Sequence, residues 1–267
     1  MASTDTRTGV FGPNRAGIEA KTLRKDRWWL APLLTFVVFA AFIVYATWRA
    51  FTGDDYYASP YLSPFYSPCL TDRCTAGSSD FGQPFSWWNL SPALVILPFP
   101  LGFRFTCYYY RKAYYRAFWL SPPACTVAEP HAKYTGEQRF PLILQNVHRW
   151  FWYAAVLVTS VLTFDAILTF RNAAHEWGHM GLGTVLMMVN VALLWLYTLS
   201  CHSCRHIMGG RLRHFSKHPV RYRLWTGVSK LNRHHAKFAW YSLFSVALVD
   251  LYIYLLASGR IADVRFF

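Results

Sequence analysis

The stretch "SCHSCRH" (Ser200–His206) places two cysteines and two histidines within six positions, at the end of a long apolar run. Thiolates and imidazoles are ligands for zinc and for iron–sulfur clusters, and imidazoles also hold haem. Each residue of an α-helix turns about 100° around the axis, so Cys201 and Cys204 lie roughly 60° apart. His202 and His206 lie about 40° apart, on a face roughly 150° from the cysteines. One helix therefore cannot present all four side chains to one metal centre.

The rest of this helix indicates which pair faces inward. Small and polar residues share the cysteine side, and bulky apolar residues occupy the far side. Helix contacts in membranes favour small and polar residues, whereas bulky apolar residues face lipid. We therefore expect Cys201 and Cys204 to face the helix bundle. His202 and His206 should point toward the headgroups or a docked partner.

Two further histidines open other apolar runs on faces that are small or mixed in character. His148 opens "HRWFWY", and His235 opens a later run, while His234 points about 100° away from His235. We expect two cysteines from one helix and one histidine from each of two others to converge near one end of the bundle. The expected ligands are Cys201, Cys204, His148 and His235, with His202, His206, His234 and Cys107 in reserve.

Several centres accept such a donor set. Zinc binds two thiolates and two imidazoles in a closed tetrahedral site. A Rieske-type [2Fe–2S] cluster uses two Cys on one iron and two His on the other. Haem b needs only an inward pair such as His148 and His235. We favour the cluster, because a structural zinc has little to do in a bundle held by packing; binding of no metal at all remains an alternative.

The elements that position these residues are apolar runs long enough to cross a bilayer, which takes about 20 residues. We predict an all-α integral membrane protein built as a five-transmembrane-helix bundle. The predicted spans cover residues 28–51, 89–118, 148–170, 180–206 and 236–258. Residues 1–27 form an N-terminal segment and 259–267 a C-terminal tail around the membrane domain 28–258.

Basic residues in the short flanks predict the orientation, because cytoplasmic loops carry an excess of Lys and Arg. Six of these residues precede the first span, and nine lie between Arg205 and Lys237. The N-terminus is then cytoplasmic and the C-terminus outside. The net charge of +14 falls on the cytoplasmic face, where it suits anionic headgroups or an acidic soluble partner. Nucleic acid is excluded as a partner, because no binding module is present.

The outer side carries a cysteine pair and other polar groups. Cys69 and Cys74 lie in "SPCLTDRCTAG", where an oxidising exterior favours a disulfide. The preceding segment "YYASPYLSPFYSP" should be extended and lie on the outer surface. Asp165 and Asp250 fall in the outer halves of their spans, either as a proton relay or as simple hydrogen-bond acceptors. Intramembrane Arg104 is expected to extend toward the inner headgroups, with ligand binding as the alternative.

A metalloprotease is a poor interpretation of "HEWGHM", although His175, Glu176 and His179 formally match H-E-x-x-H. Gly178 interrupts the helix that such a site needs, and the stretch lies in a loop before the fourth span. A transporter is also disfavoured, because no broken-helix pair recurs in repeated halves.

Long strings resemble the membrane anchor subunit of an actinobacterial succinate dehydrogenase, part of respiratory complex II. They are "CYYYRKAYYRAFWLSPPAC", "RFPLILQNVHRWFWY", "SCHSCRHIMGGRLRHFSKHP" and "SKLNRHHAKFAWYSLFSVALVDLY". The resemblance implies a flavoprotein partner with FAD and an iron–sulfur partner with further Fe–S clusters, both docked on the cytoplasmic side of the plasma membrane. It also implies quinone as electron acceptor, and a chain that does not oxidise succinate alone.

This sequence departs from the two-haem anchors of the wider family, because its first two spans contain no histidine. A [2Fe–2S] centre is the expected replacement, with a cofactor-free structural anchor or a haem b anchor of a fumarate reductase-type complex as alternatives. The quinone and proton candidates depend on the membrane side. They are Asp165, Asp250, His175 and His179 toward the outer face, and Tyr108, Arg205 or His206 toward the inner face.

Overall fold

The computed structural model describes residues 24–70, 79–83, 87, 90–125, 127, 140, 142–172 and 174–267. These residues are mostly helical. The chain divides into two compact units. The first contains residues 1–44 and 105–147, and the second contains 45–104 and 148–267.

Four helical stretches are long and apolar enough to cross a membrane, counting only residues that the structure describes. They are Leu30–Thr52, Ile143–Leu168, Leu182–Leu199 and His235–Ala257. The helices are α1 (Leu30–Thr52), α2 (Ala93–Ile96), α3 (Pro98–Thr106), α4 (Tyr108–Phe118), α5 (His148–Leu168), α6 (Leu182–Leu199), α7 (His202–Gly209), α8 (Pro219–Asn232) and α9 (His235–Ala257). Two short 3₁₀ segments span Leu142–Val147 and Phe215–Lys217.

The predicted second span, 89–118, is not one continuous helix. Pro98 begins α3, where a missing N–H is tolerated but the helix before it cannot continue. The backbone at Cys107 is extended, with φ −67° and ψ 131°, and separates α3 from α4. Since α4 carries Arg111, Lys112 and Arg116, it lacks the apolar composition of a span. The apolar stretch here is therefore the shorter Ala93–Thr106.

The predicted fourth span, 180–206, is also interrupted. The backbone at Cys201 is extended, with φ −65° and ψ 146°, so that α6 ends before it and α7 begins after it. The Cys201 sulfur accepts a hydrogen bond from the Ser203 amide at 3.4 Å and thereby caps α7. The following basic segment, expected only as a connection, contains α8.

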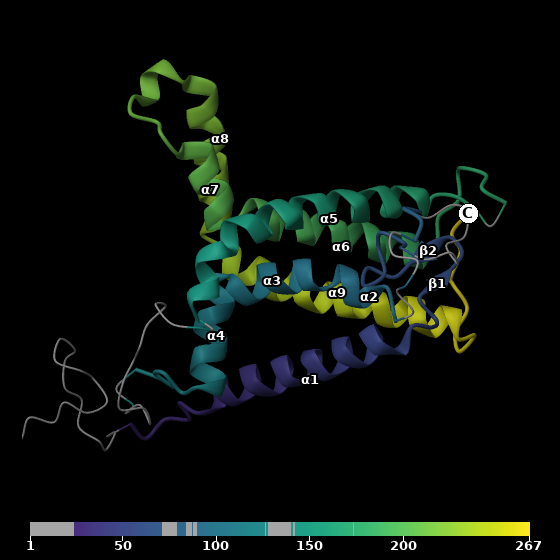
Figure 1. Ribbon diagram of the computed structural model, residues 1–267, viewed down its shortest axis with the longest axis horizontal. Helices are drawn as coiled ribbons and strands as arrows, with labels where there is room; N and C mark the ends of the chain where they lie inside the picture. Colours follow the sequence, from purple (N-terminus) through teal and green to yellow (C-terminus); the bar gives the residue numbers. More distant parts are fainter. Residues whose placement is uncertain are drawn as a thin grey trace, which may run out of the picture. The chain divides into compact units, whose positions relative to one another are not determined.

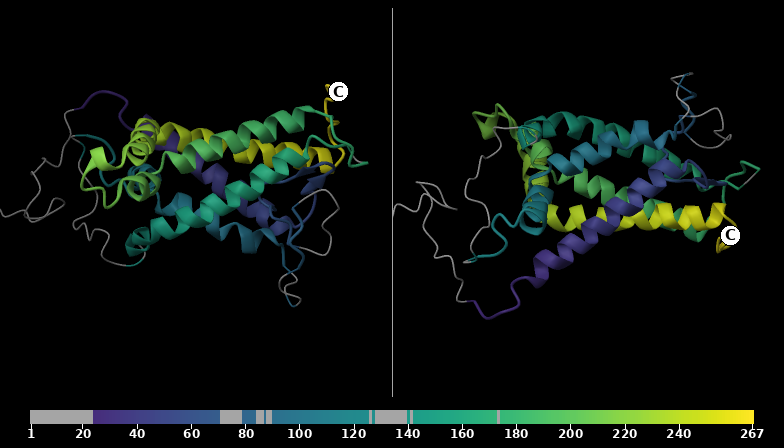
Figure 2. Two further views of the ribbon diagram at one scale, coloured as in Figure 1. Left: turned by 90° about the horizontal axis from the view of Figure 1, so that it is seen from above. Right: turned by 60° about the horizontal axis from the view of Figure 1, so that its bottom comes forward.

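Helices α5, α6 and α9 of the second unit pack side by side along most of their length (Figures 1 and 2). Their contact is apolar: Leu162 and Ala166 of α5 meet α6 and α9 residues such as Val191 and Val249 in one buried cluster. The C-terminal tail is tied to the start of α6, because Phe266 donates its amide to the Met180 carbonyl at 2.9 Å.

The Pro-spaced segment that precedes Cys69 is buried, which corrects its predicted position on the outer surface. A short hairpin of β1 (Tyr57–Ala58) and β2 (Tyr61–Leu62) leads into it. Tyr61, Phe65 and Tyr66 are all almost inaccessible. The polar partners that make this burial favourable are two helix carboxylates, which composition alone does not reveal. Ser63 donates to Asp250, and Ser67 donates to Asp165 at 2.5 Å.

The first unit is held by aromatic contacts between α1 and α4. The rings of Phe36 and Phe118 are 4.8 Å apart, and those of Phe39 and Tyr110 are 5.6 Å apart. Gln145 donates to the Tyr114 hydroxyl at 3.0 Å and accepts from Arg111. The Tyr114 hydroxyl is buried, and this burial raises its pKa above the usual value.

A buried ion pair joins the end of α1 to α9 within the second unit. Arg49 Nε lies 2.9 Å from Asp250 Oδ2, and both side chains are fully buried. Arg49 also donates to the carbonyls of Asp54 and Asp55, each at 3.2 Å. The Tyr45 hydroxyl donates to the same carboxylate at 2.5 Å. The charge of each partner is therefore compensated inside an apolar bundle.

Replacing Asp250 by Asn is expected to lower the free energy of unfolding by about 3–5 kcal/mol, because the Arg49 charge is then buried without its partner. Thermal unfolding of the detergent-solubilised protein measures the loss. The matched control is Asp54→Asn, which alters an exposed carboxylate of the neighbouring loop. The double variant Arg49→Met, Asp250→Leu should recover part of the loss, and an Asp250→Asn protein as stable as the control would contradict the prediction.

Candidate functional site

The four predicted ligands all belong to the second unit, at the end where α6 stops and where α5 and α9 begin. Cys201, Cys204 and His235 are almost completely buried, and His148 is partly buried. The reserve histidines His202, His206 and His234 are exposed. The fourth reserve residue, Cys107, is buried in the first unit.

One pair of the predicted ligands is in contact. His148 Nε2 lies 3.1 Å from Cys201 Sγ. The helix is interrupted at this point, because the backbone at Cys201 is extended and Cys201 is the N-cap of α7. The contact between Cys201 and His148 depends on this interruption. The Cys204 side chain is held inside by α7 itself, and burial raises the pKa of its thiol.

The second histidine is bound to the same turn of the chain. His235 Nδ1 lies 2.7 Å from Ser200 Oγ, and Asn232 donates to the Ser200 carbonyl at 2.7 Å. The His235 ring also stacks on Tyr197, with centroids 5.0 Å apart. Ser200 therefore fixes the orientation of the imidazole, a role that the sequence analysis did not assign. In the sequence, the position of Ser200 next to Cys201 was the signal that could have indicated this role.

No group of three or more His, Cys, Asp or Glu side chains is arranged to hold a metal ion among the residues that the structure describes. The predicted quartet is thus brought to one end of the second unit, where His148 and Cys201 are in direct contact. The described geometry gives the predicted [2Fe–2S] centre no direct support.

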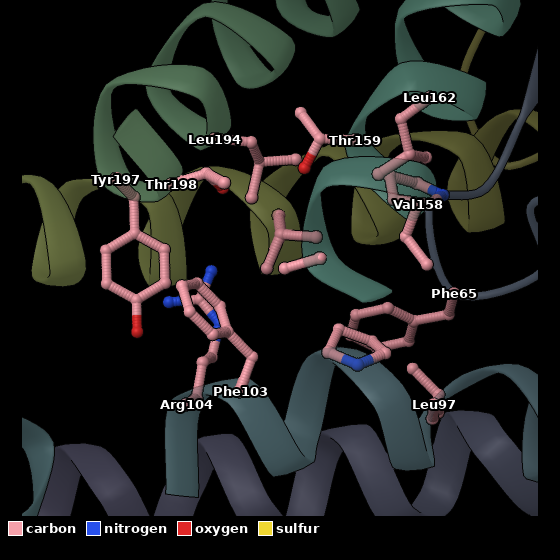
Figure 3. A pocket seen from close by; sticks show the side chains of 14 residues that line it. Phe65, Leu97, Phe103, Arg104, Val158, Thr159, Leu162, Leu194, Tyr197 and Thr198 are labelled. Atoms are coloured by element: carbon pink, nitrogen blue, oxygen red, sulfur yellow. The ribbon is translucent and has the colours of Figure 1, made fainter. Parts of the chain in front are cut away.

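A cavity of about 60 Å³ lies in the second unit beside this region (Figure 3). Phe103, Arg104 and Tyr197 gather at one end of it, and Phe65 and Leu97 lie at the other. The remaining lining residues are Pro64, Pro100, Ala155, Val158, Thr159, Leu162, Leu194, Thr198 and Val246. The lining is mainly apolar, with one cation and a few hydroxyl groups. At this volume it has room for very few water molecules and is smaller than a typical ligand pocket of about 300–1,000 Å³.

Each candidate histidine stacks on an aromatic residue that lines this cavity. Phe103 and His148 are parallel, with centroids 5.0 Å apart, and Tyr197 stacks on His235 at the same separation. Phe103 and Tyr197 also touch each other, at 5.0 Å. The Phe103 ring therefore lies between His148 and the cavity, and the Tyr197 ring lies between His235 and the cavity. These two aromatic rings are neighbours.

Arg104 lies within the bundle and does not extend to the headgroups as predicted. It donates to the Ser242 hydroxyl at 3.1 Å and to the Ala239 carbonyl at 3.3 Å, both on α9. Its guanidinium lies 4.9 Å from the centroid of the Tyr197 ring. These partners compensate the charge, so the side chain does not need to reach the surface. A charged residue within an apolar run was the signal that it has partners inside the bundle.

The two carboxylates predicted to lie in the outer halves of their spans, Asp165 and Asp250, do not line the cavity. Asp165 accepts hydrogen bonds from the Ser79 amide and hydroxyl, each at 2.8 Å, and from Ser67. Asp250 is engaged by Arg49. Both carboxylates therefore hold the buried Pro-spaced segment to the helices.

The other predicted quinone or proton candidates lie elsewhere. His175 is exposed in its loop, and His179 Nε2 is 3.2 Å from the amide of Asn172. Tyr108 is exposed on α4 in the first unit. Arg205 donates to Ser229 at 2.9 Å and so connects α7 to α8.

The predicted disulfide joins Cys69 to Cys74, and Cys69 is disulfide-bonded in the structure. Cys74 lies outside the described residues, so the pairing stays a prediction.

The cysteines are expected to differ sharply in alkylation. Maleimide reacts with the thiolate, and each unit by which a pKa rises lowers the thiolate fraction at pH 8 about tenfold. Buried Cys204 should therefore react slowly in the folded protein, whereas exposed Cys125 should react quickly. Peptide mass spectrometry after timed labelling measures both in one sample. Labelling of Cys204 as fast as that of Cys125 would show that α7 does not bury the thiol.

Comparison with known proteins identifies the family. Residues 30–259 match the family model of the actinobacterial succinate dehydrogenase subunit SdhC. A chain of the solved structure "Mycobacterium smegmatis Sdh1 complex in the apo form" is similar at 59% sequence identity, covering 97% of this chain and 99% of that chain, with a TM-score of 0.85. A search of the curated proteins gave no match. The chain thus belongs to the actinobacterial succinate dehydrogenase subunit SdhC family and is a multi-pass plasma-membrane subunit of this oxidoreductase.

Proposed function

We propose that this chain anchors the complex and passes electrons from the iron–sulfur subunit to quinone. The observation that carries the proposal is the shared aromatic wall: His148 and His235 each stack on a ring that lines the same cavity. If these imidazoles held a redox centre, one aromatic side chain, Phe103 or Tyr197, would lie between each imidazole and a quinone ring bound in the cavity. The soluble flavoprotein and iron–sulfur subunits would supply the electrons that reach it.

The donor chemistry fits a Rieske-type [2Fe–2S] centre. Cys201, Cys204, His148 and His235 provide the two thiolates and two imidazoles that such a centre takes. When bound, it supplies one-electron transfer between the partner subunit and quinone. Ser200 orients the His235 ring through Nδ1, as outer partners of metal-ligating histidines do. Phe103 covers one face of the His148 ring, and Tyr197 covers one face of the His235 ring.

The cavity is the proposed place of quinone reduction. Its apolar lining suits a quinone ring and tail, and Arg104 places a cation at one end. A fixed cation there favours the negative charge that develops on a quinone oxygen as it is reduced. Because about 60 Å³ is too small for the ring, we propose that the cavity widens when quinone enters.

We infer five crossings from the path of the chain, and the basic segments that flank the spans favour a cytoplasmic N-terminus. Ser91 hydrogen-bonds to Tyr66, and Phe103 stacks on His148. Residues 91–104 therefore extend from the loop after α1 to the start of α5. This shorter element would return the chain between α1 and α5 and would place the C-terminus outside. The soluble subunits would then dock at the basic, cytoplasmic end of the membrane helices.

The double variant His148→Ala, His235→Ala is expected to abolish quinone reduction, because both imidazole donors are lost. Succinate oxidation by an artificial dye should persist, since that reaction uses the flavoprotein. Both activities are measured on the purified complex. The matched control His202→Ala, His206→Ala removes two exposed histidines of the same region and should keep both activities. Unchanged quinone reduction in the first variant would remove the redox role of this site.

A haem b held by His148 and His235 is the second candidate, because two inward histidines are sufficient for it. The dithionite-reduced optical spectrum, the EPR spectrum, and iron and acid-labile sulfide per complex distinguish the two centres. A Rieske-like signal that is lost in Cys201→Ser, together with a fall in labile sulfide per complex in that variant, supports the cluster. Haem bands, with labile sulfide per complex unchanged in Cys201→Ser, would replace it by haem.

Filling the cavity should weaken quinone binding. Ala155→Leu adds bulk at a buried lining position, so the KM for quinone is expected to rise about tenfold, the factor for ~1.4 kcal/mol of lost binding. Dye-linked succinate oxidation should not change. The neighbouring Ala154→Leu makes the same change at a residue outside the lining and is the matched control. An equal KM for both variants would place quinone elsewhere.

A further inference from the structure

The hairpin of α7 and α8 is fixed at the end of the membrane bundle by two very short connections. Two residues separate α6 from α7, and two separate α8 from α9. Both ends of the hairpin are therefore at the level where the spans α6 and α9 terminate. Figure 1 shows the hairpin projecting from the second unit across the direction of α5, α6 and α9, and Figure 2 shows the same arrangement from above.

One face of α8 (Pro219–Asn232) is used to pack against α7. Trp225 covers Gly209 so closely that a Cβ there would lie 2.3 Å from the indole. Arg221 donates to the carbonyls of Met208 at 2.7 Å and Gly210 at 2.5 Å, which caps the end of α7. The hairpin is thus a packed element of its own.

The adjacent face of α8 is apolar; it is exposed at Val220 and Leu224 and half-buried at Val228 and Leu231. At about 100° per residue, Val220, Leu224, Val228 and Leu231 form a stripe within roughly 80° of one another. Val220 is 69% exposed and Leu224 is 53% exposed, and α8 contains no buried residue. Arg223 and Lys230 border this stripe on the side away from α7.

The charge around the hairpin is of one sign. The sequence from Trp177 to Val249 contains no Asp or Glu, and nine Lys and Arg lie between Arg205 and Lys237. The aromatic residues Phe215 and Tyr222 are exposed, and their rings are in tilted contact with centroids 5.1 Å apart. Aromatic rings and basic residues around an apolar stripe are typical of helices that lie in the membrane interface.

We propose that the α7–α8 hairpin lies in the headgroup layer and binds anionic phospholipid. The stripe from Val220 to Leu231 would enter the boundary of the acyl chains. Arg223 and Lys230 would bind the phosphates, as would the exposed Arg211 and Arg213 of the hairpin loop. The hairpin would then lie along the membrane surface beside the spans and fix the depth of the candidate redox site in the bilayer.

Two observations favour lipid over a soluble protein as the occupant. The hairpin extends sideways from the ends of the spans, which keeps the whole stripe within reach of the headgroups (Figure 1). The basic residues border the apolar stripe along its length, which matches a surface with charge above and acyl chains below. A folded acidic partner would need charges complementary to the individual basic residues, but it would not need a continuous apolar stripe.

Hydrogen–deuterium exchange of the complete complex in nanodiscs tests the proposal. Nanodiscs of phosphatidylcholine are compared with nanodiscs that also contain phosphatidylglycerol. Amides of residues 215–232 should exchange roughly fivefold more slowly in the anionic discs, the factor for one basic residue at an anionic surface. Exchange that is slow in both lipids would show that a protein subunit covers the hairpin, and exchange that is fast in both would show that nothing does. Either result overturns the proposal.

Variants separate the two parts of the surface. Replacing all four basic residues by Gln (Arg211→Gln, Arg213→Gln, Arg223→Gln, Lys230→Gln) should remove the difference between the two lipids. Val220→Ser, Leu224→Ser should raise exchange in the anionic discs. Arg260→Gln, a charge at the opposite end of the bundle, is the control and should keep the difference. Equal exchange of all variants in detergent verifies that α8 remains folded. A lipid effect that persists in both hairpin variants would contradict the assignment.

Discussion

The buried ion pair of Arg49 and Asp250 is the constraint on which the second unit depends. An arginine inside an apolar bundle is tolerated only when a carboxylate and further acceptors compensate it. These acceptors are the loop carbonyls of Asp54 and Asp55, so the charge draws the chain after α1 onto α9. The Pro-spaced segment follows and places Phe65 in the wall of the cavity.

Helix interruptions create the candidate site at the other end. The extended backbone at Cys201 separates α6 from α7, and it allows the same short turn to present Ser200 to His235 and Cys201 to His148. A continuous helix would rotate these residues by about 100° from one another and could not serve both histidines in this way. The interruption also turns the chain into the α7–α8 hairpin that projects from the bundle.

The inward orientation of several groups could be predicted, whereas their partners could not. Helical periodicity and small residues indicated that Cys204 and His235 face the bundle, because these signals are local. The burial of Tyr61 and Tyr66 was not predictable, since it depends on serines that meet Asp165 and Asp250 at long sequence separation. Arg104 was misplaced for the same reason: its acceptors are on α9.

By itself, the sequence determined the membrane character of the chain, its family and the residues with ligand chemistry, because these follow from composition, run length and residue type. Only the tertiary structure decided where the spans break, which segment is buried and which rings line the cavity. Those features depend on hydrogen bonds and ring contacts between residues far apart in the chain, such as Phe103 with His148. A one-dimensional pattern records that these groups need partners, but packing selects the partners.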